Sequence, residues 1–105
     1  MNTPKDKKWL LKKLEEDVRR IAKSINDTRG ICPSGKIAEA REYLNSVLKL
    51  NLERSITERM RRLHCALRKA MTALNETRRD FHSKHLKSVR EDISDILKKY
   101  ESQIN

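Results

Sequence analysis

This chain of 105 residues contains very few of the residues that interrupt helices or build turns. It has two glycines, two prolines and four aromatic residues, and neither glycine nor proline occurs from Lys36 to Asn105. Such a composition leaves little material for tight turns or for the strands of a layered sheet. It therefore favours long helices over a compact fold of several layers.

Apolar residues are also scarce, at 36% of the chain against 38% for charged residues. No stretch is long and apolar enough to span a bilayer, and the early lysines Lys5, Lys7 and Lys8 leave no apolar core for a signal peptide. We therefore expect no membrane span and a cytoplasmic location, or a nuclear one in a eukaryote. A core this thin usually needs a partner to bury enough surface, so we expect a homodimer or a subunit of a complex.

Motifs that carry chemistry are lacking as well. Segment 30–36 only partly resembles a phosphate-binding loop, because Ile37 replaces the required hydroxyl residue and the segment follows a predicted helix rather than a strand. His82 and His85 have a spacing that suits a metal, but the sequence places no third ligand beside them. We therefore expect no catalytic residues, no metal site, no cofactor and no enzymatic activity.

Cys32 and Cys65 lie far apart in the sequence and belong to no paired motif. A reduced intracellular pair is the default for such cysteines. The sequence alone leaves a disulfide between them open.

The apolar residues that are present recur with helical spacing. Between residues 56 and 81 they step by four and three, which keeps them in one stripe along a helix. This seam consists of Ile56, Met60, Leu63, Leu67, Leu74 and Phe81, with Ala70 and Thr77 between them. Comparable stripes occur within residues 11–25, 37–48 and 86–100. The sustained periodicity argues against disorder, which high charge alone would favour. It predicts a single all-α domain over residues 1–105, an antiparallel helical bundle of three long helical runs with coiled-coil-like seams, the last run divisible into two helices.

Local signals set the expected boundaries of the first two helices. Thr3 can cap the first helix and Pro4 can open it, and this helix should end near residues 26–29. The cluster of breakers from Gly30 to Gly35 separates it from the second helix, for which Ser34 is a suitable N-cap.

Two later boundaries rest on weaker signals. The second helix either breaks near residues 51–54, where Ser55 and Glu58 would form a capping box, or continues through them, which the lack of glycine and proline favours. After residue 81 the apolar spacing slips, so we expect a turn or kink between residues 82 and 87. Ser88 and Glu91 form a second possible capping box, for a last helix that ends near residue 102.

Positive charge is concentrated in one part of the chain. The chain has 25 basic and 15 acidic residues, a net charge of +10, and a pI near 10.0. Residues 55–90 hold ten basic and three acidic residues, whereas residues 91–105 have a net charge of −2. The acidic C-terminal helix is therefore expected to fold back along the basic helix, held partly by charge.

The basic residues of the 56–81 helix are expected to form one exposed patch, since Arg61 and Arg62 recur one heptad later as Arg68 and Lys69. Such a patch can meet the phosphates of a nucleic acid backbone. No aromatic residue interleaves it in the sequence, which argues against base stacking and single-strand readout. The candidate nucleic-acid-binding residues are Arg61, Arg62, Arg68, Lys69, Arg78 and Arg79, with a second strip formed by Lys12, Lys13, Arg19 and Arg20.

The sequence thus predicts a small basic helical accessory protein that binds nucleic acid, RNA or DNA, through backbone phosphate contacts. The alternative is a helical protein-interaction module, such as an adaptor, chaperone or complex subunit. In that case the apolar seam would form the interface with a partner helix, and the basic surface would bind an acidic protein partner.

Overall fold

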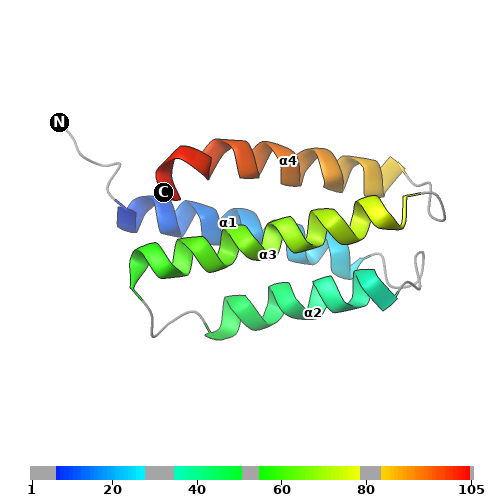
Figure 1. Cartoon of the computed structure of the whole chain (residues 1–105), viewed down its shortest axis with the longest axis horizontal. Coiled ribbons are helices and arrows are strands. Elements are labelled where there is room, and N and C mark those ends of the chain that lie inside the picture. Colours follow the sequence, from blue (N-terminus) through cyan, green and yellow to red (C-terminus); the bar gives the residue numbers. More distant parts are fainter. Residues whose placement is uncertain (1–6, 28–34, 51–54, 79–83, 105) are drawn as a thin grey trace.

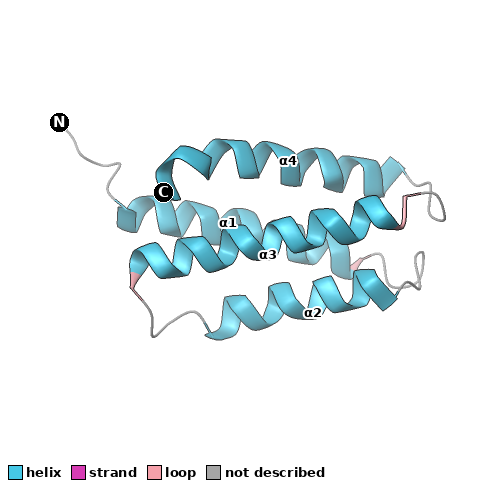
Figure 2. Ribbon diagram, viewed as in Figure 1, coloured by secondary structure: helices cyan, strands magenta, loops and turns pink. Residues whose placement is uncertain are grey.

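The computed structural model describes residues 7–27, 35–50, 55–78 and 84–104 of the chain. Within these residues the protein is all-α, with four helices and no strand (Figures 1 and 2). The helices are α1 (Lys7–Asn26), α2 (Gly35–Leu50), α3 (Ile56–Glu76) and α4 (Lys84–Ile104), and successive helices run antiparallel. The predicted fold class is confirmed, with the division of the long run into two helices that the sequence allowed.

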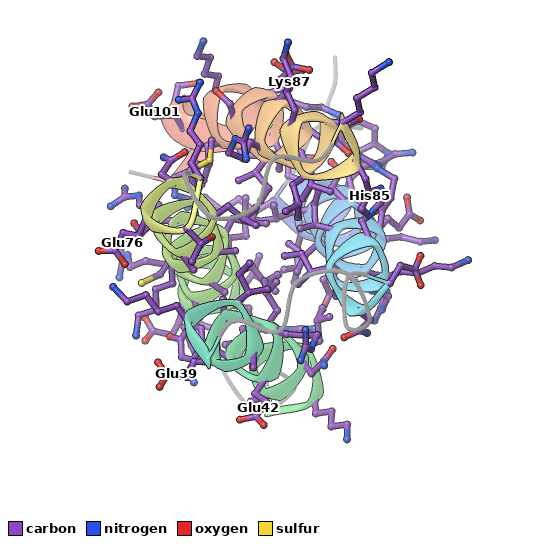
Figure 3. The ribbon with its side chains drawn as sticks, turned by 90° about the vertical axis from the view of Figure 1, so that its right-hand side faces the viewer. Glu39, Glu42, Glu76, His85, Lys87 and Glu101 are labelled. Carbon is purple, nitrogen blue, oxygen red and sulfur yellow. The ribbon has the colours of Figure 1, made fainter. Side chains whose placement is uncertain are left out.

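Helices α1 and α3 form the centre of the bundle. They contact each other directly and each also contacts α2 and α4, whereas α2 and α4 do not touch within the described residues. Viewed along the bundle, α2 and α4 lie on opposite sides of the α1–α3 pair (Figure 3). One consequence is that α3 borders two surface grooves, one toward α2 and one toward α4.

The apolar stripes of the four helices fill a single core. Its fully buried side chains include Leu14 and Ile21 of α1, Leu44 of α2 and Ile93 of α4. The predicted seam of α3 belongs to this core, because all its members between residues 60 and 74 are buried: Met60, Leu63, Leu67 and Leu74. Ile56 is partly buried against the core, and Phe81 lies outside the described residues. The seam is therefore covered by the chain's own helices.

Ser55 is the N-cap of α3 and sets the point at which this helix begins. Its backbone is extended, with φ −60° and ψ 159°, and its side chain accepts a hydrogen bond from the Glu58 N–H at 3.2 Å. This bond satisfies one of the unpaired N–H groups at the start of a helix. The expectation of a helix that continues through residues 51–54 is therefore wrong, because a serine cap starts a new helix without any glycine or proline.

The start of α4 also differs from the expectation. Ser88 lies inside the helix, which begins at Lys84, so the capping box of Ser88 and Glu91 is wrong. A tertiary contact holds this turn instead: His85 Nε2 lies 3.0 Å from the Ser24 carbonyl oxygen of α1. The predicted caps at residues 3, 4 and 34 fall outside the described residues.

Asp17 ties α1 to α4. Its carboxylate accepts a 2.9 Å hydrogen bond from the Tyr100 hydroxyl and pairs with Arg20 at 2.9 Å. Arg20 also pairs with Asp92 of α4 at 2.9 Å, and Lys99 Nζ lies 3.8 Å from Asp17. Tyr100 is buried, and this burial, together with the carboxylate beside it, raises the pKa of its phenol well above the ordinary value. Charged and polar pairs thus attach α4 to α1, a contact that the segment charges did not predict.

We expect Tyr100→Phe to lower the free energy of unfolding by about 1–3 kcal/mol at neutral pH, because Asp17 loses a hydrogen bond in a buried setting. Since the folded pKa of Tyr100 lies above the unfolded value of about 10, the wild type should also lose stability as pH rises past that value, by up to about 1.4 kcal/mol per pH unit. The variant lacks this part of the pH dependence. Urea unfolding of both proteins at neutral and strongly alkaline pH measures the difference, and identical pH profiles would contradict it.

Candidate nucleic-acid interface

The predicted basic patch of α3 is divided between two sides of the helix. Lys69 lines the groove toward α2, whereas Arg78 lines the groove toward α4. Arg68 lies between them: it lines the α2–α3 groove and precedes by one turn Met71, which lines the α3–α4 groove. The single continuous patch expected from heptad spacing is therefore two adjoining basic surfaces, and Arg79 lies outside the described residues.

The α3–α4 groove has a volume of about 230 Å³ and collects three cationic side chains. Arg78, which lies two residues beyond the end of α3, lines this groove together with Lys87 and Arg90 of α4, and Glu91 is the acidic residue of the lining. Lys87 extends away from the bundle on the outer side of α4 (Figure 3). Arg90 is half-buried, and its buried Nη1 atom has no hydrogen-bond partner among the described residues. The groove therefore offers an excess of positive charge, and the guanidinium group of Arg90 has a donor atom without a partner among the described residues.

Lys87 and Arg90 were counted in the charge of residues 55–90 but were not predicted to join the site. The structure brings them to Arg78 because α4 runs antiparallel to α3, which places the start of one helix beside the end of the other. The sequence signal was the run of basic residues that continues past residue 81 into the next helix. Recognising it required knowing which helices pack together.

The α2–α3 groove is larger, with a volume of about 540 Å³. Arg68 and Lys69 line it from α3, and Tyr43 lines it from α2. Lys69 Nζ lies 4.2 Å from the centre of the Tyr43 ring, a cation–π contact. An aromatic ring thus stands among the basic residues, although none interleaves them in the sequence.

Several of the predicted phosphate ligands already pair with acids. Arg20 pairs with Asp17 and Asp92, as described above, Lys13 Nζ lies 3.9 Å from Glu16, and Arg61 lies 3.5 Å from Glu58. The predicted residues that have no acidic partner within the described part of the chain are Lys12, Arg19, Arg62, Arg68, Lys69 and Arg78. Of these, Arg68, Lys69 and Arg78 line the two grooves beside α3.

The histidines and cysteines form no metal centre in the described residues, where no group of three or more His, Cys, Asp or Glu side chains could hold an ion. His64 is buried and its Nε2 lies 3.2 Å from the Leu97 carbonyl oxygen, so it links α3 to α4 much as His85 links α4 to α1. Cys65 is exposed and free, while Cys32 and His82 lie outside the described residues.

The arrangement suits binding of an extended anion. Guanidinium groups present paired donors that match phosphate oxygens, and ammonium groups add mobile point charges. None of the described helices is long and apolar enough to cross a membrane. Comparison with protein-family models, curated proteins and solved structures finds no match to this chain.

Proposed function

We propose that this protein binds nucleic acid through contacts between basic side chains and backbone phosphates, without catalysing a reaction. One observation carries the proposal: Arg78, Lys87 and Arg90 line the α3–α4 groove, and Arg68 of the adjoining α2–α3 groove lies one turn before Met71, which also lines the α3–α4 groove. These four basic residues, Arg68, Arg78, Lys87 and Arg90, are here named the basic edge. No acidic side chain pairs with any of the four within residues 7–27, 35–50, 55–78 and 84–104.

The length of the basic edge suits a nucleic acid strand. Arg68 lies in α3, and Arg78 follows two residues after the end of this helix at Glu76; the helical part alone, from Arg68 to Glu76, rises about 12 Å. Phosphates recur about every 3.4 Å of rise along one strand of a duplex, so an edge of this length spans several of them. Contacts of this kind release counterions and read no base sequence. This supports binding by charge and shape rather than by sequence.

The state of Arg90 supports an anion in the α3–α4 groove. A buried donor on a charged group that lacks a partner costs about 1–3 kcal/mol or more. The Nη1 atom of Arg90 is such a donor, and Arg78 and Lys87 add positive charge that Glu91, the acidic residue of the groove lining, offsets only in part. A phosphate in the groove would offset the repulsion among the three cations, and a shift of the Arg90 side chain toward the phosphate would give this donor an acceptor.

The protein-interaction alternative has less support, because it needs an accessible apolar seam. Met60, Leu63, Leu67 and Leu74 are buried, and Trp9 is the only large hydrophobic side chain exposed among the described residues. An acidic protein partner would have to use the basic edge itself. The proposal therefore predicts a preference for nucleic acid over an acidic peptide on that surface.

NMR chemical-shift mapping tests the proposal at the level of residues. On titration of labelled protein with a short oligonucleotide at about 0.15 M salt, we expect the largest changes at the Nε–Hε signals of Arg68, Arg78 and Arg90. Arg19, exposed on α1, is the internal control and should change little. Changes centred on Arg19, or an equal response to a poly-glutamate peptide of the same charge, would overturn the proposal.

A further inference from the structure

We infer that the groove between α2 and α3 accepts an unpaired base of a single-stranded nucleic acid. In this arrangement the base stacks on the Tyr43 ring, while Arg68 and Lys69 contact the neighbouring phosphates. The inference rests on the proposed function and deepens it, because it specifies that the preferred nucleic acid has unpaired bases.

The groove is built into the packing of the two helices. Its volume of about 540 Å³ lies within the range of small-molecule sites, about 300–1,000 Å³. Ala40 of α2 and Ala73 of α3 both line it and are each 7% exposed, so two small side chains leave a hollow where larger ones would fill the space. A flat planar ring system can enter a hollow of this kind.

Two contacts cross the groove, and Cys65 extends its lining one turn of α3 beyond the first of them. Lys69 lies over Tyr43 toward one end, and Lys36 pairs with Glu76 at 3.0 Å across the other. Each helix advances seven residues between these contacts, which is about 10 Å of rise. The distance is enough for a single nucleotide and too short for an extended run of stacked bases.

The Tyr43 ring is placed to stack with a base. It is partly buried and packs against the core, yet one face of the ring is covered by the ammonium group of Lys69, 4.2 Å from its centre. Lys69 is exposed, and its flexible side chain is free to move from the ring to a phosphate. Base–aromatic stacking is stronger than an exposed cation–π contact, so a base would displace the ammonium group from the ring.

The charges around the groove orient the nucleotide. Arg68 and Lys69 lie together on α3 near the Tyr43 end, whereas Glu39 and Glu76 line the opposite end from α2 and α3. Figure 3 shows these two carboxylates on the outer sides of their helices. Lys36 offsets the charge of Glu76 and leaves Glu39 to repel a phosphate. Phosphate is therefore favoured at the end with Arg68 and Lys69, with the base directed along the groove.

The test compares two single strands of equal length and charge, an oligothymidine and an oligomer in which every nucleotide is abasic. We expect the wild type to bind the oligothymidine about five- to 150-fold more tightly, the range that a stacked base contributes. Tyr43→Leu should remove this preference and leave affinity for the abasic strand unchanged. Trp9→Leu, which removes an exposed ring outside the groove, is the matched control and should keep the preference. Fluorescence anisotropy measures each affinity, and circular dichroism checks the fold of each variant.

The outcomes separate this inference from the proposed function. Equal affinity of the wild type for both strands would overturn the stacking site and leave phosphate binding intact, whereas no binding to either would overturn both. A preference that survives Tyr43→Leu, or is lost in Trp9→Leu, would also overturn the site. Cys65 lines the same groove and is exposed, so in a Cys32→Ser background its alkylation should be slowed by oligothymidine and not by the abasic strand. Equal alkylation rates with the two strands would count against the groove.

Discussion

Replacement of Arg68, Arg78, Lys87 and Arg90 together by glutamine is expected to weaken nucleic acid binding about a thousandfold at about 0.15 M salt. Each phosphate contact adds about 0.9 to the slope of log affinity against log salt. At about 0.15 M salt, this slope corresponds to a contribution of about 0.7 log unit to the affinity. Four contacts therefore account for about three log units. The fold should be retained, because none of the four side chains pairs with an acid in the described part of the chain.

A matched variant on α1 separates the site from the overall charge. Lys8, Lys12, Arg19 and Lys23 are exposed on that helix, and their replacement by glutamine changes the net charge by the same four units. This variant also removes part of the second strip predicted from the sequence. We expect its affinity to fall by less than about tenfold, because α1 would contribute only long-range attraction. An equal loss in the two variants, measured by fluorescence anisotropy, would mean that affinity follows net charge and not the basic edge.

The largest expected effect on stability comes from Leu67→Ala. Leu67 is fully buried in the seam of α3, so truncation should lower the free energy of unfolding by about 2–5 kcal/mol. Total stabilities of domains are about 5–15 kcal/mol, so this is a large share. Thr72→Ala, at an exposed position on the same helix, should change stability by less than about 0.5 kcal/mol. Urea unfolding followed by circular dichroism measures both.

The same variant tests whether the seam serves one chain or two. Because Leu67 packs inside the chain's own bundle, its loss should destabilise the protein equally at all protein concentrations. The alternative is that the seam lies between two copies of the chain. In that case the midpoint of urea unfolding would rise with protein concentration for the wild type, and this rise would be lost in the variant. The homodimer expected from the sequence stays a prediction, and light scattering at several concentrations tests it.

Periodicity predicted the fold because it reflects burial along each helix. The apolar residues that recur every three or four positions pack into one core, which includes Leu14 of α1 and Ile93 of α4. The helix boundary at Ser55 was harder to predict from the sequence, because two local signals disagreed there. The absence of glycine and proline favoured one helix, but a serine that caps the Glu58 N–H was sufficient to begin another.

The candidate site was only partly predictable, because its residues meet through tertiary packing. Heptad spacing grouped Arg61 and Arg62 with Arg68 and Lys69 on one helix, but it gave no sign that Tyr43 lies beside Lys69. Charge counts likewise identified a basic region without showing that Arg20 is held by two carboxylates. Both features depend on which helix faces which, and a single sequence carries little information on that pairing.

The most direct test of the basic edge as a phosphate-binding surface is the slope of log affinity against log salt for duplex DNA, measured for the wild type and for the variant that lacks Arg68, Arg78, Lys87 and Arg90. If these four side chains contact phosphates, the slope of the wild type should be steeper by about 3.6. Equal slopes in the two proteins would show that the four cations contact no phosphate, and would contradict the proposed function at its centre.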